Sequence, residues 1–186
     1  MMPLEPKVRG TIIREEIKAA RSLGGDDAVD AALEQLDPEV AAELRDVLAV
    51  SWARLSSLRH FHESAAAVLQ EDPTSWHLRV VEHATREMFH STWRFFLRFT
   101  SPEAVVKRAS SMYARIFDAG QMEASIIAPG HSIARLTGWP DPPAFHLDGV
   151  ATGMVTVLKV AKVEAVRIRW TRTSDGAEFE VRSAAR

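Results

Sequence analysis

The sequence contains no cysteine among its 186 residues. This absence excludes disulfide bonds, thiol nucleophiles, iron–sulfur clusters and zinc–thiolate sites. Long apolar runs are also missing: the longest, Val150–Val157, is interrupted by Gly153 and two threonines. It falls far short of the roughly 20 residues that a membrane-spanning helix needs. Because the N-terminal residues also lack the apolar core of a signal peptide, we expect a cytoplasmic protein without a membrane span.

The chain carries little net charge and few motifs of known chemistry. Its formal charge is −2, so no overall field attracts nucleic acid or anionic lipid. A glycine-rich phosphate loop, a G-x-S-x-G elbow and an H-E-x-x-H pair are all absent from the sequence. The carboxylate pairs Glu15-Glu16 and Asp26-Asp27 fall at polar positions, where we expect water contact and ordinary pKa values. We therefore assign no catalytic residue and expect neither an enzyme nor a nucleic-acid partner.

The first two-thirds of the chain has the apolar periodicity of helices. Apolar residues recur at spacings of three and four over residues 11–23, 54–70 and 102–118. Asp37-Pro38-Glu39 and Ser101-Pro102-Glu103 are typical helix starts, since each places proline in the first turn after a capping side chain. Around Ser51-Trp52 the pattern loses phase, and we expect a bend there.

After Gly120 the apolar period changes from 3.6 residues to two, which predicts strands. Pro129-Gly130 predicts a type II turn between the first two strands, and Asp175-Gly176 predicts the last hairpin, whose arginines and glutamates would pair across the strands. Between the hairpins lies a helix over residues 145–162, in which Gly149 and Gly153 would let a neighbour approach the backbone. The order is helices, strand, strand, helix, strand, strand. We expect a single α+β domain over residues 1–186, with a helical part (1–119) packed on a four-stranded antiparallel sheet (120–186).

Two groups of histidines are candidate metal ligands. His60 and His62 point about 200° apart on one helix and cannot share a metal; His62 falls on the apolar stripe and is interpreted as a core histidine. His83, Glu87 and His90 share one helical face and offer ligands that zinc or iron accepts. A solvated polar face is the preferred interpretation, because the trio lies opposite the apolar face and no fourth ligand can be named. No metal or cofactor is therefore assigned.

The segment Ser91–Thr100 interleaves arginines with aromatic residues. Such a surface is compatible with base stacking, but without a wider basic patch we interpret it as buried aromatic residues with arginine stems lying over them.

Several short motifs together resemble a paralogous family of myxobacterial proteins of unknown function, which are single-domain chains of about this length. The motifs are KVRG at Lys7–Gly10, Ser51-Trp52, RFFLRFTSPE at Arg94–Glu103, YARIFDAG at Tyr113–Gly120, TGWPDPPAF at Thr137–Phe145 and the D-G-x-E-F-E-V strand at Asp175–Val181. This family is similar to the 4-vinyl reductase domain, the haem nitric-oxide-binding domain and the TRAPP subunits. The kinship implies a helical part on a four-stranded sheet, a pocket, and frequent dimerisation.

The sequence departs from these relatives at the positions that carry their chemistry. Ala177 stands where vinyl-reductase-like domains carry a cysteine. Tyr113-Ala114-Arg115 lacks the Y-x-S-x-R signature with which the haem-binding relatives hold porphyrin. The resemblance therefore implies the fold without cysteine-based chemistry and without haem.

Two functions fit these observations. The first is a non-catalytic sensor or signalling module that holds a small apolar ligand, with Phe95, Phe96, Tyr113 and Phe117 as pocket candidates; plain core packing explains the same residues. The second is a protein-interaction adaptor without a ligand. Both include a homodimer formed through helices, and a charge at Leu58 is expected to give monomers if that helix forms the interface.

Overall fold

The computed structural model describes residues 5–91 and 102–184, which form two compact units. Unit 1 contains the residues up to Ala84 together with Ile116–Asp118, and unit 2 contains Thr85–Arg115 and the residues from Ala119 onward. The units do not follow the expected division at residue 119, because residues 85–115 group with the sheet. Organisation as a single domain stays a prediction, and each unit is described by itself.

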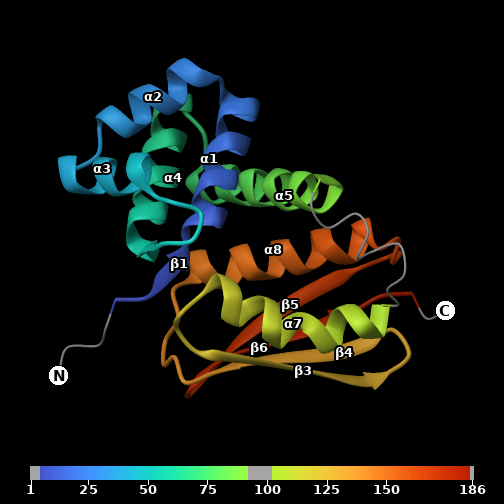
Figure 1. Ribbon diagram of the computed structural model, residues 1–186. Coiled ribbons are helices and arrows are strands. Elements are labelled where there is room, and N and C mark those ends of the chain that lie inside the picture. Colours follow the sequence, from blue (N-terminus) through green and yellow to red (C-terminus); the bar gives the residue numbers. More distant parts are fainter. Residues whose placement is uncertain (1–4, 92–101, 185–186) are drawn as a thin grey trace. The chain divides into compact units, whose positions relative to one another are not determined.

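Unit 1 is mainly helical (Figure 1). Its helices are α1 (Gly10–Gly24), α2 (Asp26–Glu34), α3 (Pro38–Asp46), α4 (Leu55–Leu69) and the first part of α5 (Pro73–Ser91). Two three-residue strands, β1 (Lys7–Arg9) and β2 (Trp52–Arg54), pair antiparallel, with Val8 opposite Ala53. The expected bend is present at Ser51, and β2 follows it directly from Trp52. Strands this short show too little alternation to be distinguished from a loop.

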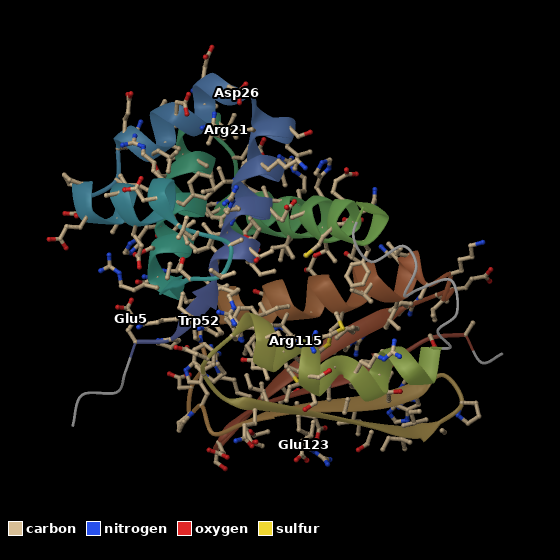
Figure 2. The ribbon with its side chains drawn as sticks, viewed as in Figure 1. Glu5, Arg21, Asp26, Trp52, Arg115 and Glu123 are labelled. Carbon is tan, nitrogen blue, oxygen red and sulfur yellow. The ribbon has the colours of Figure 1, made fainter. Side chains whose placement is uncertain are left out.

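Side-chain caps begin α3, at the predicted Asp37, and α5, whereas α1, α2 and α4 begin without one. Asp37 Oδ1 accepts a hydrogen bond from the Glu39 amide at 2.9 Å, and Asp72 Oδ2 accepts one from the Ser75 amide at 2.8 Å. Arg21 lies 3.0 Å from Asp26 and 2.6 Å from Asp30, so one guanidinium joins the end of α1 to the start of α2; Arg21 and Asp26 are labelled in Figure 2.

The apolar stripes of these helices meet in the core of unit 1. Its fully buried side chains include Val8, Ile13, Phe61, Trp76 and Val80. Leu58 is only 2% exposed within the single chain. A charge at Leu58 would therefore disrupt the core of unit 1, so the expectation that it reports a dimer interface is wrong.

Unit 2 holds the predicted sheet. Its elements are α7 (Pro102–Ile116), β3 (Gln121–Ala128), β4 (His131–Thr137), α8 (Ala144–Val160), β5 (Arg167–Thr173) and β6 (Gly176–Arg182). The strands lie in the order β3-β4-β6-β5, and all neighbours are antiparallel. The α+β class, the four-stranded antiparallel sheet and the strand–strand–helix–strand–strand order are confirmed.

The two faces of the sheet differ in chemistry. Met122, Leu136 and Phe179 are buried on one face, and Figure 1 shows α7 and α8 on the same side of the sheet. On the other face Arg135 of β4 pairs with Glu178 of β6 at 2.8 Å. This pair bridges different strands from those expected, because β6 has β4 as well as β5 for a neighbour.

Glycine is required at each of the two hairpins for a different reason. Gly130 has φ of 72°, which confirms the expected turn after Pro129. In the last hairpin the turn residues are Ser174 and Asp175, and Gly176 already begins β6 without a positive φ. A Cβ at Gly176 would lie 2.0 Å from the Leu136 carbonyl oxygen, so this glycine is required by the close approach of β4.

Helix α8 is apolar along its length, with only Asp148 and Lys159 charged. Nevertheless, no helix among the described residues is both long and apolar enough to span a bilayer. A Cβ added at Gly153 would meet no atom of the described residues within 4 Å, so none of them is the expected close neighbour at that position.

Replacing each of two glycines of unit 2 with alanine is expected to have opposite effects. Gly176→Ala forces the β6 backbone away from β4 and should lower the free energy of unfolding by about 2 kcal/mol or more. Gly153→Ala adds a methyl group in open space inside a helix and should raise it by about 0.5–1 kcal/mol. Urea unfolding of both variants measures the difference, and equal effects would contradict the backbone contacts described for these two glycines.

Candidate functional site

Unit 2 contains a buried polar cluster on the helix-covered side of its sheet. Tyr113 of α7 and His146 of α8 are 5% and 3% exposed. The Tyr113 hydroxyl donates to the Ala119 carbonyl at 3.0 Å and lies 2.9 Å from His146 Nε2. Because the hydroxyl's one proton is given to the carbonyl, Nε2 carries its own hydrogen and donates to the tyrosine oxygen. The Trp139 ring packs on the same imidazole, with centroids 4.6 Å apart.

Asp175 of the last hairpin holds the loop before α8 and thereby positions Trp139. Asp175 Oδ2 accepts from the Gly138 amide at 3.0 Å, and its carbonyl accepts from the Trp139 amide at 3.1 Å. Trp170 of β5 donates to Asp148 of α8 at 2.8 Å. Side-chain bonds from two strands thus fix the first turns of α8 over the sheet.

The predicted pocket residues fall in different parts of the molecule. Tyr113 is in unit 2, and Phe117 is half-buried in unit 1, where its backbone bridges Val8 of β1. Phe95 and Phe96, with most of the arginine–aromatic segment, lie outside the described residues. Their joint role as a pocket stays a prediction.

Unit 1 contains a second buried cluster, formed by Glu16 of α1, His62 of α4 and His77 of α5. The three residues are 6%, 1% and 4% exposed. His62 Nε2 lies 2.8 Å from Glu16 Oε2, and the His62 and His77 ring centroids are 4.8 Å apart. One carboxylate oxygen and one ring nitrogen from each histidine all lie within 4.8 Å of one another. Residues 61 positions apart in the sequence thus meet in one small volume.

Burial sets the charge of this cluster. It raises the pKa of Glu16 to about 7, against a smaller opposing effect of His77. It lowers the pKa of His62 to about 3 and is also the main reason why the pKa of His77 falls to about 3. Both imidazoles are therefore neutral near pH 7, and the contact between His62 and Glu16 is a hydrogen bond rather than an ion pair.

The sequence analysis placed His62 correctly in the core and Glu16 wrongly at the surface. Ile13, Glu16 and Ala20 are buried along α1 at spacings of three and four. This spacing was the available signal, because a carboxylate on the apolar stripe of a helix faces the core. The same signal was available for His77, because Val80 and Val81 are buried three and four residues after it on α5.

The surface trio is less well defined. His83 is half-buried and Glu87 is exposed, both on α5, and the side chain of His90 is outside the described part. Metal binding by these three residues stays a prediction.

No family model matches the chain, and no curated protein matches it in sequence. Solved structures do match. An oxygen-binding H-NOX domain related to soluble guanylate cyclases, in its oxygen complex, superposes with a TM-score of 0.73 at 16% identity, covering 96% of this chain and 95% of that chain. The unliganded Fe(II) H-NOX protein of K. algicida superposes with a TM-score of 0.70 at 14% identity, covering 96% of this chain and 97% of that chain. The expected kinship with the haem nitric-oxide-binding domain is confirmed at the level of the fold.

A haem group does not fit the buried residues of the part of the chain that the structure describes. Haem iron needs a protein ligand such as a histidine ring nitrogen directed at the porphyrin. Among the described buried histidines, His146 Nε2 is bonded to Tyr113, and His62 is bonded to Glu16 and packed on His77. The only tyrosine of the sequence is followed by Ala114-Arg115-Ile116-Phe117, so the Y-x-S-x-R signature is absent.

Acidification is expected to destabilise unit 1 through its buried cluster. In the unfolded chain the two histidines bind protons below their ordinary pKa of 6.5, whereas in the folded protein they do so only near pH 3. Their contribution to the stability of the folded state is therefore lost as the pH falls from 6.5 towards 3. The raised Glu16 pKa acts oppositely, because its contribution is lost as pH rises from 4.5 to about 7. Two histidines outweigh one carboxyl, so between pH 4.5 and 6.5 the free energy of unfolding should fall by about 1 kcal/mol for each unit by which the pH is lowered.

His77→Gln isolates this effect, because the contributions of the remaining histidine and of the Glu16 carboxyl to the pH dependence of stability then nearly cancel. The variant should show almost no change from this cluster over the same pH range, whereas His60→Gln, at an exposed position of α4, should retain the full slope. Urea unfolding with EDTA present, so that only protons bind, gives both slopes. Equal slopes in wild type and His77→Gln would show that the cluster does not titrate in this way.

Proposed function

We propose that this chain is a non-catalytic sensor module that uses the H-NOX fold to bind a small apolar molecule in place of haem. The ligand lies against the middle of α8 in unit 2. The proposal keeps the expected cytoplasmic location and the membership of the myxobacterial family that the sequence motifs resemble.

The observation that carries this proposal is the incomplete covering of α8. Leu147 near its start and Thr156–Leu158 near its end are buried, but all eight residues from Asp148 to Val155 are only half-buried. Among the described residues, none has an atom within 4 Å of a Cβ added at Gly153, which leaves open space beside it. Apolar surface left in contact with water costs about 25 cal/mol per Å², so a small apolar molecule that covers this stretch binds favourably.

The nearby polar cluster supports sensing rather than catalysis. The Tyr113 hydroxyl and His146 Nε2 bond to each other, and the hydroxyl also bonds to the Ala119 carbonyl. Groups engaged in this way hold α7 and α8 in place over the sheet. A ligand that displaces α8 would strain these bonds, which gives the module a means of reporting occupancy.

A protein-interaction adaptor is the second candidate. The observation that favours it is the exposed pair Ile126 and Ile127, 41% and 54% exposed, near the end of the edge strand β3. Strand edges with exposed apolar residues are suited to pairing with another chain, including a second copy. A homodimer is part of both proposals.

Extraction of small molecules from the purified protein tests the sensor proposal. Wild-type protein denatured in organic solvent should release one apolar compound in near-equimolar amount, identified by mass spectrometry. Gly153→Leu fills the open space beside α8 and should reduce that amount at least tenfold. Ala114→Leu, which adds the same bulk at an exposed position of α7, should not.

The alternative outcomes are distinct. If no compound is released by wild type, or if Gly153→Leu retains it, ligand binding at α8 is excluded and the adaptor becomes the better account. An absorption band of haem in the purified protein would contradict both the proposed apolar ligand and the conclusion that haem does not fit the described residues.

A further inference from the structure

We propose that Glu16, His62 and His77 form a divalent transition-metal site inside unit 1, of the kind that binds zinc or ferrous iron. The site is separate from the ligand proposed for α8, and neither depends on the other.

The geometry supplies three donors that converge on one point. The carboxylate oxygen and the two ring nitrogens come from three different helices and lie within 4.8 Å of one another. In a tetrahedral site with metal–ligand bonds of about 2.0–2.2 Å, neighbouring donors are about 3.4 Å apart. The 2.8 Å contact between His62 and Glu16 therefore has to open slightly, and the longer separations have to close by shifts of about 1 Å.

The chemistry of the donor set is selective. Two imidazoles and one carboxylate form the ligand set of many zinc and non-haem iron centres, which leave further positions for water or another small ligand. Magnesium and calcium prefer oxygen donors and are poorly served by this set. Three protein donors with no fourth among the described residues thus indicate a centre with an open coordination position.

The surroundings hold the donors rigidly. The Phe61 ring packs edge-on against His62 with centroids 5.3 Å apart, and Trp76, beside His77 in sequence, is fully buried. Such packing limits the rotation of the imidazoles, and a site with restricted ligands loses little freedom when metal binds. A metal here would join α1, α4 and α5 directly and stabilise unit 1.

Titration of the chelator-treated protein with ZnCl₂ tests the proposal. Calorimetry should show one equivalent bound, and CoCl₂ should give the visible absorption of a low-symmetry Co²⁺ centre with nitrogen and oxygen ligands. Glu16→Gln keeps the shape of the side chain, and it should weaken Zn²⁺ binding at least tenfold and remove the Co²⁺ band; His77→Gln should do the same.

The surface of α5 provides matched controls. Glu87→Gln and His83→Gln make the same chemical changes outside the buried cluster, and both should bind Zn²⁺ as wild type does. Circular dichroism of each variant checks that the helices are retained, and the Co²⁺ spectrum of the wild-type protein tests the site without any substitution.

Three results would overturn the site: no uptake of either metal by wild type, unchanged uptake by a folded Glu16→Gln variant, or loss of uptake in the α5 surface variants instead. Because the readout is the bound metal and not an organic compound, failure here leaves the ligand at α8 untouched.

Discussion

The helical unit is organised around a carboxylate that water hardly reaches. Glu16 lies on the apolar stripe of α1, between Ile13 and Ala20, and its partners His62 and His77 come from α4 and α5. A buried carboxylate is costly unless its neighbours satisfy it, so these three side chains fix which face of each helix turns inward. Substitution of one member leaves the polar groups of the other two without a hydrogen-bond partner. The cluster therefore tolerates substitution less well than an apolar core of the same volume.

The sheet unit is organised differently, by one covered face. Alternating residues such as Leu136 and Phe179 are buried on the side where α8 lies, and the charged pair Arg135–Glu178 occupies the opposite side. The Tyr113–His146 bond and the Trp170–Asp148 bond then fix α7 and α8 above that face. The fold is similar to that of the H-NOX domains, but among the described buried histidines His62 is bonded to Glu16 and His146 to Tyr113.

Local patterns predicted most of the elements. The caps at Asp37 and Asp72, the turn at Gly130 and the alternation of the last hairpin depend on neighbouring residues, which a single sequence displays. What the sequence could not supply was long-range pairing: the β1–β2 pair, the approach of β4 to Gly176, and the meeting of Glu16 with His62 and His77. The last case was missed because Glu15-Glu16 was interpreted as a polar pair, although the two residues lie on different faces of one helix.

The two proposals give the molecule two kinds of ligand, a metal ion in unit 1 and an apolar molecule against α8 in unit 2. The native protein is therefore expected to contain both a metal ion and a small organic molecule in addition to the polypeptide.

Native mass spectrometry of untagged protein, purified without chelator and compared with its denatured mass, tests this claim most directly. The account predicts two additions to each chain, one of a single zinc or iron ion and one of a small organic molecule. A native mass equal to that of the polypeptide alone, or one increased by haem, would contradict it.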